Sequence, residues 1–180
     1  ASAGITWQYY SKSRNMVSND QLRATAGFAY HHVNRPKINF LENNSQRLYP
    51  KFVFHGTMLM GLQNTNMAIV PSTFFSAQGP SKEILVGSML RMLVQHESKY
   101  THITKEMAYS IGVYYRVGDA IIPAILVEFS NFKIGASYDV TLSSLRKANG
   151  YRGGMEFSFA YVTPNPFAIK KGVDKKRYTF

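Results

Sequence analysis

The stretch that decides the fold runs from Phe132 to Val162 and reads FKIGASYDVTLSSLRKANGYRGGMEFSFAYV. Apolar side chains recur at every second position, first from Phe132 to Leu142 and again from Met155 to Tyr161. Turn-forming residues, Asn149-Gly150, lie between the two runs. Because successive side chains of a strand point to opposite faces, this period predicts two strands, each with an apolar and a polar face.

The same two-residue period recurs along the rest of the chain, and helical periodicity never persists over a full window. Turn signals such as Gly118-Asp119 and Ser130-Asn131 separate the runs. The sequence therefore predicts an all-β fold. About nine strands are expected, over residues 3–11, 22–32, 50–63, 67–78, 83–96, 106–117, 120–130, 132–144 and 153–163.

The length of these strands bears on their environment. Most hold about ten to fourteen residues, whereas about five or six are typical of soluble sheets and roughly 9–11 suit a tilted transmembrane strand. The polar faces carry small residues and isolated charges, such as Gly135, Ser137 and Asp139, while the apolar faces are rich in Tyr and Phe. This distribution favours a transmembrane antiparallel β-barrel over a soluble barrel or sandwich.

Composition sets broader limits. The 180 residues form one predicted domain, residues 1–180, in which 164–180 are a basic C-terminal tail. The net charge of +11 suits nucleic acid, an anionic membrane surface or an acidic protein partner, and does not choose among them. The chain has no cysteine, which excludes disulfides, thiolate metal sites and a cysteine nucleophile.

Two features of the chain concern its membrane topology. The best apolar run, Ala120 to Val127, is interrupted by Pro123 and falls far short of the roughly 20 residues of a spanning helix. Single-chain bacterial barrels have an even number of strands, whereas the expected number here is odd, and the sequence opens without a signal peptide. We therefore expect N-terminal strands of the barrel to be missing from this sequence.

Five segments resemble, in order and spacing, the PorP/SprF family, over roughly the last 150 residues. They are His32 to Pro36, Tyr115 to Pro123, Glu128 to Val140, Ser143 to Ala148 and Arg152 to Glu156. The sequence departs from the family at Tyr151, an extra residue before Arg152, and at its C-terminus, which lacks the family's Cys-Pro-Arg-Phe-like end.

The resemblance implies an integral outer-membrane β-barrel of the type IX protein secretion system. That system belongs to Bacteroidota and is linked in many of them to gliding motility. Family members are longer at the N-terminus, which agrees with the odd strand number. The resemblance also implies partners among the periplasmic ring and motor-associated components, or a secreted adhesin. It leaves open which branch of the family this chain represents.

Charges on the polar strand faces are expected to pair inside the barrel for structure rather than for acid–base catalysis. The expected network comprises Arg116, Glu128, Lys133, Asp139 and Glu156, with Arg23 and Arg91 also within reach of its acids. The five histidines show no metal-ligand spacing, and no nucleophile elbow or phosphate loop is present. The sequence therefore predicts no enzyme activity, no metal and no cofactor.

Basic and loop residues are the predicted contacts with partner proteins, and the loop 33–49 is the best candidate surface. They are Asn34, Arg35, Arg146, Lys147, Arg152, Lys175, Lys176 and Arg177. Arg152-Gly153-Gly154 is interpreted as a turn with a glycine bulge rather than an RNA-binding fragment, so nucleic acid is not an expected partner.

The function predicted from these features is that of an outer-membrane scaffold or anchor, embedded in lipid, with its C-terminus in the periplasm. A diffusion or uptake channel of the same architecture is the first alternative. A soluble all-β ligand-binding barrel is the second.

Overall fold

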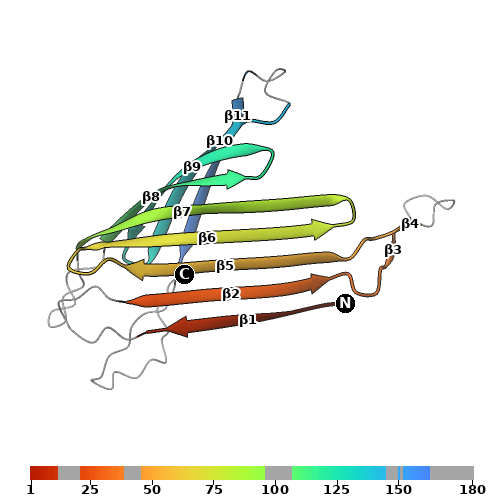
Figure 1. Ribbon diagram of the computed structural model, residues 1–180, viewed down its shortest axis with the longest axis horizontal. Coiled ribbons are helices and arrows are strands. Elements are labelled where there is room, and N and C mark those ends of the chain that lie inside the picture. Colours follow the sequence, from red (N-terminus) through yellow and green to blue (C-terminus); the bar gives the residue numbers. More distant parts are fainter. Residues whose placement is uncertain (12–20, 39–45, 96–106, 145–149, 151, 163–180) are drawn as a thin grey trace.

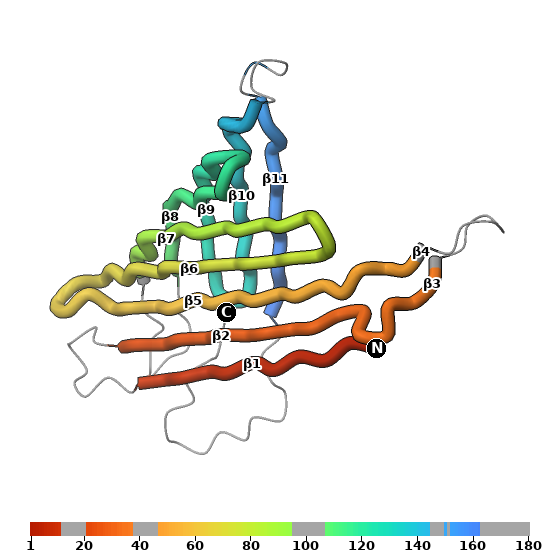
Figure 2. Tube along the Cα trace, turned by 45° about the vertical axis from the view of Figure 1, so that its right-hand side comes forward, coloured from red at the N-terminus to blue at the C-terminus, as the bar shows by residue number. Residues whose placement is uncertain are grey.

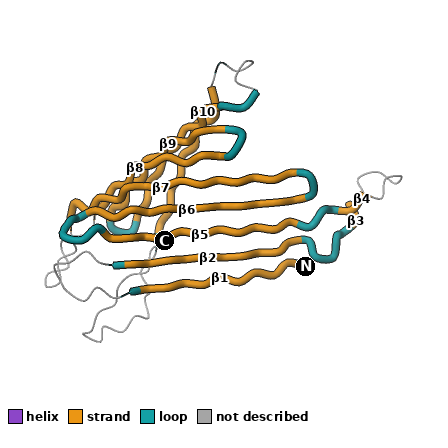
Figure 3. The backbone as a smooth tube through the Cα atoms, viewed as in Figure 1, coloured by secondary structure: helices purple, strands orange, loops and turns teal. Residues whose placement is uncertain are grey.

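The computed structural model describes residues 1–11, 21–38, 46–95, 107–144, 150 and 152–162. These residues form eleven strands, and no helix is present among them (Figures 1 and 3). The strands are β1 (Ser2–Tyr10), β2 (Leu22–His31), β3 (Lys37–Ile38), β4 (Gln46–Arg47), β5 (Lys51–Gly61), β6 (Met67–Gln78), β7 (Ser81–Gln95), β8 (Met107–Arg116), β9 (Ala120–Phe129), β10 (Phe132–Thr141) and β11 (Arg152–Tyr161).

Nine of these strands form one antiparallel sheet, in the order β1-β2-β5-β6-β7-β8-β9-β10-β11. Each long strand pairs with the next long strand along the chain, so the sheet is a meander. Its strands turn steadily in direction from β1 to β11, and the sheet is strongly curved (Figures 1 and 2). The sheet is open, because β1 and β11 each pair on one side only.

The prediction of an all-β fold with nine long strands is confirmed. Most strand ends lie within two residues of their predicted positions, and the largest difference is at β10, which ends at Thr141 rather than at residue 144. The small hairpin of β3 and β4, inside the predicted loop 33–49, was not predicted. Its two strands hold two residues each, which is too short for a two-residue period to be visible.

The pairing register sorts the side chains of the nine strands onto two faces. Phe54 lies opposite both Phe28 and Phe75, and Ile111 lies opposite both Leu90 and Ile125, so apolar residues line up from strand to strand. We call this side the outer face. Its exposed members include Ile5, Trp7, Phe28, Phe54, Ile84, Ile111, Val113, Ile125, Ile134, Phe157 and Phe159.

The opposite side, the inner face, holds small and charged residues. The hydrophobic residues that are buried among those described, such as Ala108, Ala120 and Ile122, belong to this face. The buried polar residues Ser76 and Ser110 belong to it as well. The sheet thus has its apolar side exposed and its polar side sheltered, which is the reverse of a soluble barrel.

The connections between strands lie at two ends of the sheet. The end that we call the hairpin end carries the connections that follow β2, β6, β8 and β10, including the β3–β4 hairpin. The far end carries those that follow β1, β5, β7 and β9, together with Val162, the residue after β11. This division decides which predicted contact residues can act together.

Candidate functional site

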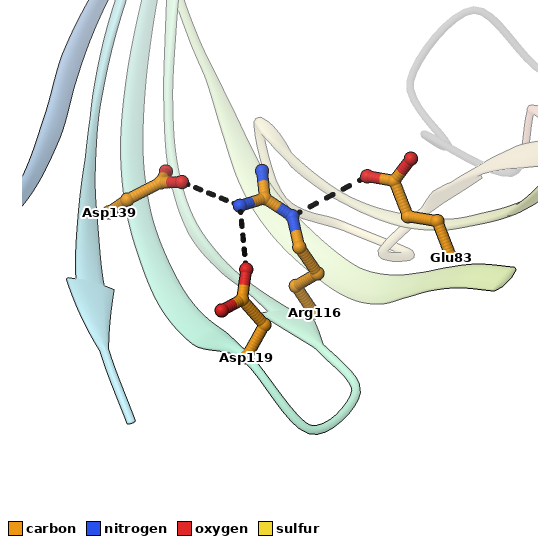
Figure 4. Close-up of polar contacts among 4 residues, drawn as sticks. All are labelled: Glu83, Arg116, Asp119 and Asp139. Carbon is orange, nitrogen blue, oxygen red and sulfur yellow. Dashed lines mark hydrogen bonds and ion pairs between the residues drawn. The ribbon is translucent and has the colours of Figure 1, made fainter. Parts of the chain in front are cut away.

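Arg116, at the end of β8, is surrounded by three carboxylates from three different elements (Figure 4). Its Nη1 donates to Oδ2 of Asp139 on β10 at 2.7 Å and to Oδ2 of Asp119, in the β8–β9 turn, at 3.3 Å. Its Nε lies 3.5 Å from Oε1 of Glu83 on β7, an ion pair without a hydrogen bond. Asp139 is the closest of the three partners.

Curvature of the sheet brings these residues together. Asp139 and Arg116 come from strands that are two apart, separated by about 9–10 Å in a flat sheet, and both side chains point to the inner face. Only 27% of the Arg116 side chain and 16% of the Asp139 side chain are exposed. The pair is therefore largely withdrawn from water.

Backbone hydrogen bonds tie the same turn to β10. The Asp119 carbonyl oxygen accepts from the amides of Leu142 and Ser143 at 2.7 and 3.0 Å, and its own amide donates to the Arg116 carbonyl at 3.0 Å. Asp119 thus joins the β8–β9 turn to the end of β10 through its backbone carbonyl, while its side chain contacts Arg116 of β8. We call Glu83, Arg116, Asp119 and Asp139 the Arg116 cluster.

A second cluster lies on the inner face toward the far end. Glu128 of β9 accepts from Arg91 of β7 at 2.7 Å through Oε2, and its Oε1 lies 2.9 Å from Nζ of Lys133 on β10. Here too the arginine reaches across an intervening strand. All three side chains are less than a fifth exposed. We call these residues the Glu128 cluster.

The fifth residue of the predicted network is placed differently. Glu156 is on the edge strand β11, where it lies opposite Ser137 of β10, and its side chain is exposed. It borders a hollow of about 200 Å³ on the inner face, together with Tyr114, Arg116 and Ser137. No cation of the described residues forms an ion pair with Glu156. The other four residues of the network divide between the two clusters.

Sequence reasoning did not find every member of the clusters. Arg91 was expected to reach an acid and does, whereas Arg23 donates to the Gln21 side chain at 3.2 Å. Glu83 and Asp119 were not expected in the network. Asp119 follows Arg116 by three residues, a spacing that a tight turn brings together, and this was the available signal. The position of Glu83 depends on the register of β7 and had no such signal.

The predicted partner-contact residues that are described lie at the hairpin end. The N-terminal amino group donates to Oδ1 of Asn34 at 2.8 Å, and the Val33 amide donates to the Ala1 carbonyl at 3.1 Å. Arg35 and Arg152 are exposed, and Arg152 begins β11 at the same end. The remaining predicted contacts lie outside the described residues: Arg146, Lys147, Lys175, Lys176 and Arg177. So does the tail, 164–180.

The predicted glycine bulge is confirmed. The pairing of β10 with β11 shifts between Tyr138 and Val140, opposite Met155 and Arg152. Gly153, which falls in this interval, lies so close to the Asp139 backbone that a Cβ atom there would overlap it. The bulge therefore positions the residue that pairs with Arg116.

Two further observations limit the chemistry of the described residues. No group of three or more His, Asp or Glu side chains among them is arranged to hold a metal ion. The parts of the chain that the structure describes also include no apolar helix of membrane-spanning length.

Comparison with protein families supplies the identity. Residues 1–161 match the family model described as type IX secretion system membrane protein PorP/SprF. The match is longer at the N-terminus than the resemblance in the motifs, and it ends at Tyr161, the last residue of β11. No match was found among curated proteins or among solved structures. The chain belongs to the PorP/SprF family of type IX secretion system membrane proteins.

Proposed function

We propose that this protein is a non-enzymatic integral β-barrel of the outer membrane that serves type IX secretion as a scaffold or anchor. It would hold the periplasmic secretion complex, or an exported surface adhesin, at the membrane. The observation that carries the proposal is the combination of an apolar outer face with an inner face crossed by ion pairs. A barrel of this kind is fixed in lipid by its outer face and offers its ends to partners.

The outer face supports lipid contact. Ile111, Val113 and Ile125, from the middle of β8 and β9, are each more than half exposed. Tyr109 and Tyr115 lie on the same face toward the two ends of β8 and are also exposed. Aromatic residues that flank an aliphatic band are typical of membrane barrels, where they lie at the two interfaces.

The inner face favours a scaffold over a channel. Both clusters join strands that are two apart, so their side chains extend across the inner surface rather than along it. Each cluster also joins charges of opposite sign: one carboxylate contacts two cations in the Glu128 cluster, and one guanidinium contacts three carboxylates in the Arg116 cluster. Ion selectivity rings instead keep charges of one sign turned to the pore.

The orientation that we propose places the far end, with Val162, in the periplasm and the hairpin end outside. Outer-membrane barrels have short periplasmic turns and longer outer loops. Both ends of the sheet carry tight turns, such as Gly118-Asp119 and Ser130-Asn131, and the longest connection, 32–50, lies at the hairpin end, which is the observation that supports this orientation. Under this orientation the hairpin end contacts an exported adhesin and the far end contacts the periplasmic complex.

Cysteine labelling tests the membrane topology. Because the chain has no cysteine, single cysteines at the exposed Val33 (hairpin end) and at Asn131 (far end) give an unambiguous signal. In intact cells a large, membrane-impermeant maleimide should label position 33, and label position 131 only after the outer membrane is opened. The reverse order would overturn the orientation, and labelling of both in intact cells would overturn membrane insertion.

The scaffold role needs its own experiment. Affinity purification in mild detergent should recover other type IX secretion components or a secreted adhesin. Planar-bilayer recordings should show no large steady current. Large steady currents without copurifying components would instead support the channel.

A further inference from the structure

The β3–β4 hairpin places like charges opposite each other. Lys37 and Arg47 are direct cross-strand partners in this two-stranded ladder, and both side chains are exposed. Like charges directly opposite in an antiparallel ladder are destabilising unless an anion lies between them. No acidic side chain of the described residues lies within ion-pair distance of either one. Among the described residues, the two cations of the hairpin therefore have no anionic partner.

The base of this hairpin is fixed to the sheet. The Leu48 amide donates to the Pro36 carbonyl at 3.0 Å, which continues the pairing of the two arms below the ladder. The Gln78 side chain, at the end of β6, donates to the Tyr49 carbonyl at 3.3 Å. The ladder itself stands away from the ends of β2 and β5 (Figures 1 and 2). Lys37 and Arg47 thus lie on a hairpin that extends from the sheet and is held at its base by hydrogen bonds.

Other cations of the same connection add to the charge. Arg35 precedes the hairpin and Lys51 begins β5, so that residues 33–51 hold four cations and one acid, Glu42, which lies outside the described residues. The far end differs, because its described turns, Leu62 to Asn66 and Ser130-Asn131, contain no charged residue. Among these connections, positive charge is therefore concentrated in residues 33–51.

We propose that this cationic hairpin, comprising Arg35, Lys37, Arg47 and Lys51, binds a carboxylate-rich segment of a partner protein. The inference deepens the scaffold function proposed above and rests on it. Carboxylates suit the planar fork of an arginine, which can hold one in a bidentate contact, and a neighbouring lysine adds a second donor. Lys37 and Arg47 are cross-strand partners, so their charged groups are close enough to bind two acidic residues that are near each other in an extended peptide.

The position of the hairpin favours a protein over lipid head groups. Lys82 and Arg152 are exposed at strand ends of the same end of the sheet, directly beside the apolar outer face. Lys82, Arg152 and also Lys51, the first residue of β5, lie at the level of the strand ends, where a barrel in a membrane meets lipid phosphates. The ladder that carries Lys37 and Arg47 instead stands beyond the ends of β2 and β5 (Figure 2), where a partner protein could reach it.

Fluorescence anisotropy with the full chain in zwitterionic lipid nanodiscs tests the proposal. The probe is a labelled oligoglutamate peptide, and binding is measured at low and physiological salt. Lys37→Glu should weaken binding by about tenfold or more, because it removes one contact and repels the peptide. This variant also places opposite charges across the ladder, so the hairpin should remain folded. Lys82→Glu, an equal charge change at the same end, should change binding less than twofold.

The outcomes of these binding measurements distinguish a specific peptide site from a general response to charge and from lipid binding. An equal loss in the Lys37 and Lys82 variants would show a response to net charge and overturn the site. Binding to vesicles of anionic phospholipid, but not to oligoglutamate, that depends on Lys37 would replace the protein partner with lipid phosphate. If secretion components copurify with both wild type and Lys37→Glu, the scaffold function survives and this inference fails. If nothing copurifies with wild type, the scaffold function itself fails.

Discussion

Replacing Arg116 by methionine should destabilise the folded sheet substantially, because three carboxylates would converge without their common cation. Removing one partner of a buried ion pair costs about 3–5 kcal/mol, whereas exposed pairs contribute about 0–1 kcal/mol. The side chains of Arg116 and its closest partner Asp139 are 27% and 16% exposed, which lies nearer the buried limit. We therefore expect Arg116→Met to lower the free energy of unfolding by about 2–3 kcal/mol.

Urea unfolding of the full chain in phospholipid vesicles measures this change. Fluorescence of the one tryptophan, Trp7, reports the transition, and it lies on the outer face of β1, several strands away from the substitution. Arg23→Met is a matched control, because Arg23 is on the inner face of β2 and forms no ion pair with a described acid. The control should lose less than about 1 kcal/mol.

A double-mutant cycle isolates the pair itself. Arg116→Met combined with Asp139→Asn should cost less than the sum of the two single changes, since removing the acid relieves the uncompensated charge. The coupling energy should be about 1–3 kcal/mol. Equal losses for Arg116→Met and Arg23→Met, or a coupling near zero, would refute the conclusion that the Arg116 cluster stabilises the sheet.

Three further predictions follow from the same faces and strands. Glu128→Gln should lower the free energy of unfolding by about 1–3 kcal/mol, because it removes the carboxylate charge that both Arg91 and Lys133 contact, while Glu156→Gln should change it by less than about 0.5 kcal/mol. Gly153→Ala should cost about 1–3 kcal/mol, because its methyl group would overlap the β10 backbone, while Gly154→Ala, with open space around it, should be tolerated. Val113→Arg on the outer face should cost about 2–4 kcal/mol in a bilayer, and equal stability of this variant and Val113→Leu would exclude lipid contact there.

The sequence predicted the strands and their faces well, because a two-residue period records directly which side chains share a face. The run Phe132 to Val140 shows this, since its alternating apolar positions fall on the outer face of β10. The two-residue period does not predict which side chains contact each other across the inner face. Asp139 reaches Arg116 across the intervening strand β9, and Glu83 joins them through the register of β7. Arg23 was expected to reach an acid, but its neighbours on β1 and β5 are uncharged.

Glu156 was expected in the charge network, and its place on an edge strand accounts for the absence of an ion pair with a described cation. β1 and β11 run in the same direction, because they are the first and the ninth strand of an antiparallel sheet. In a bilayer the outward backbone groups of β1 and β11 must find hydrogen-bond partners. If these two strands paired with each other, the pairing would be parallel. An odd number of further strands between them would keep every pairing antiparallel. Glu128, on β9, contacts cations on both sides of its strand, Arg91 of β7 and Lys133 of β10. Glu156, on β11, has a neighbouring strand on one side only. Both ion-pair clusters lie between β7 and β10, within the paired interior of the sheet. Their geometry therefore does not depend on how the edges close, whereas the environment of Glu156 does.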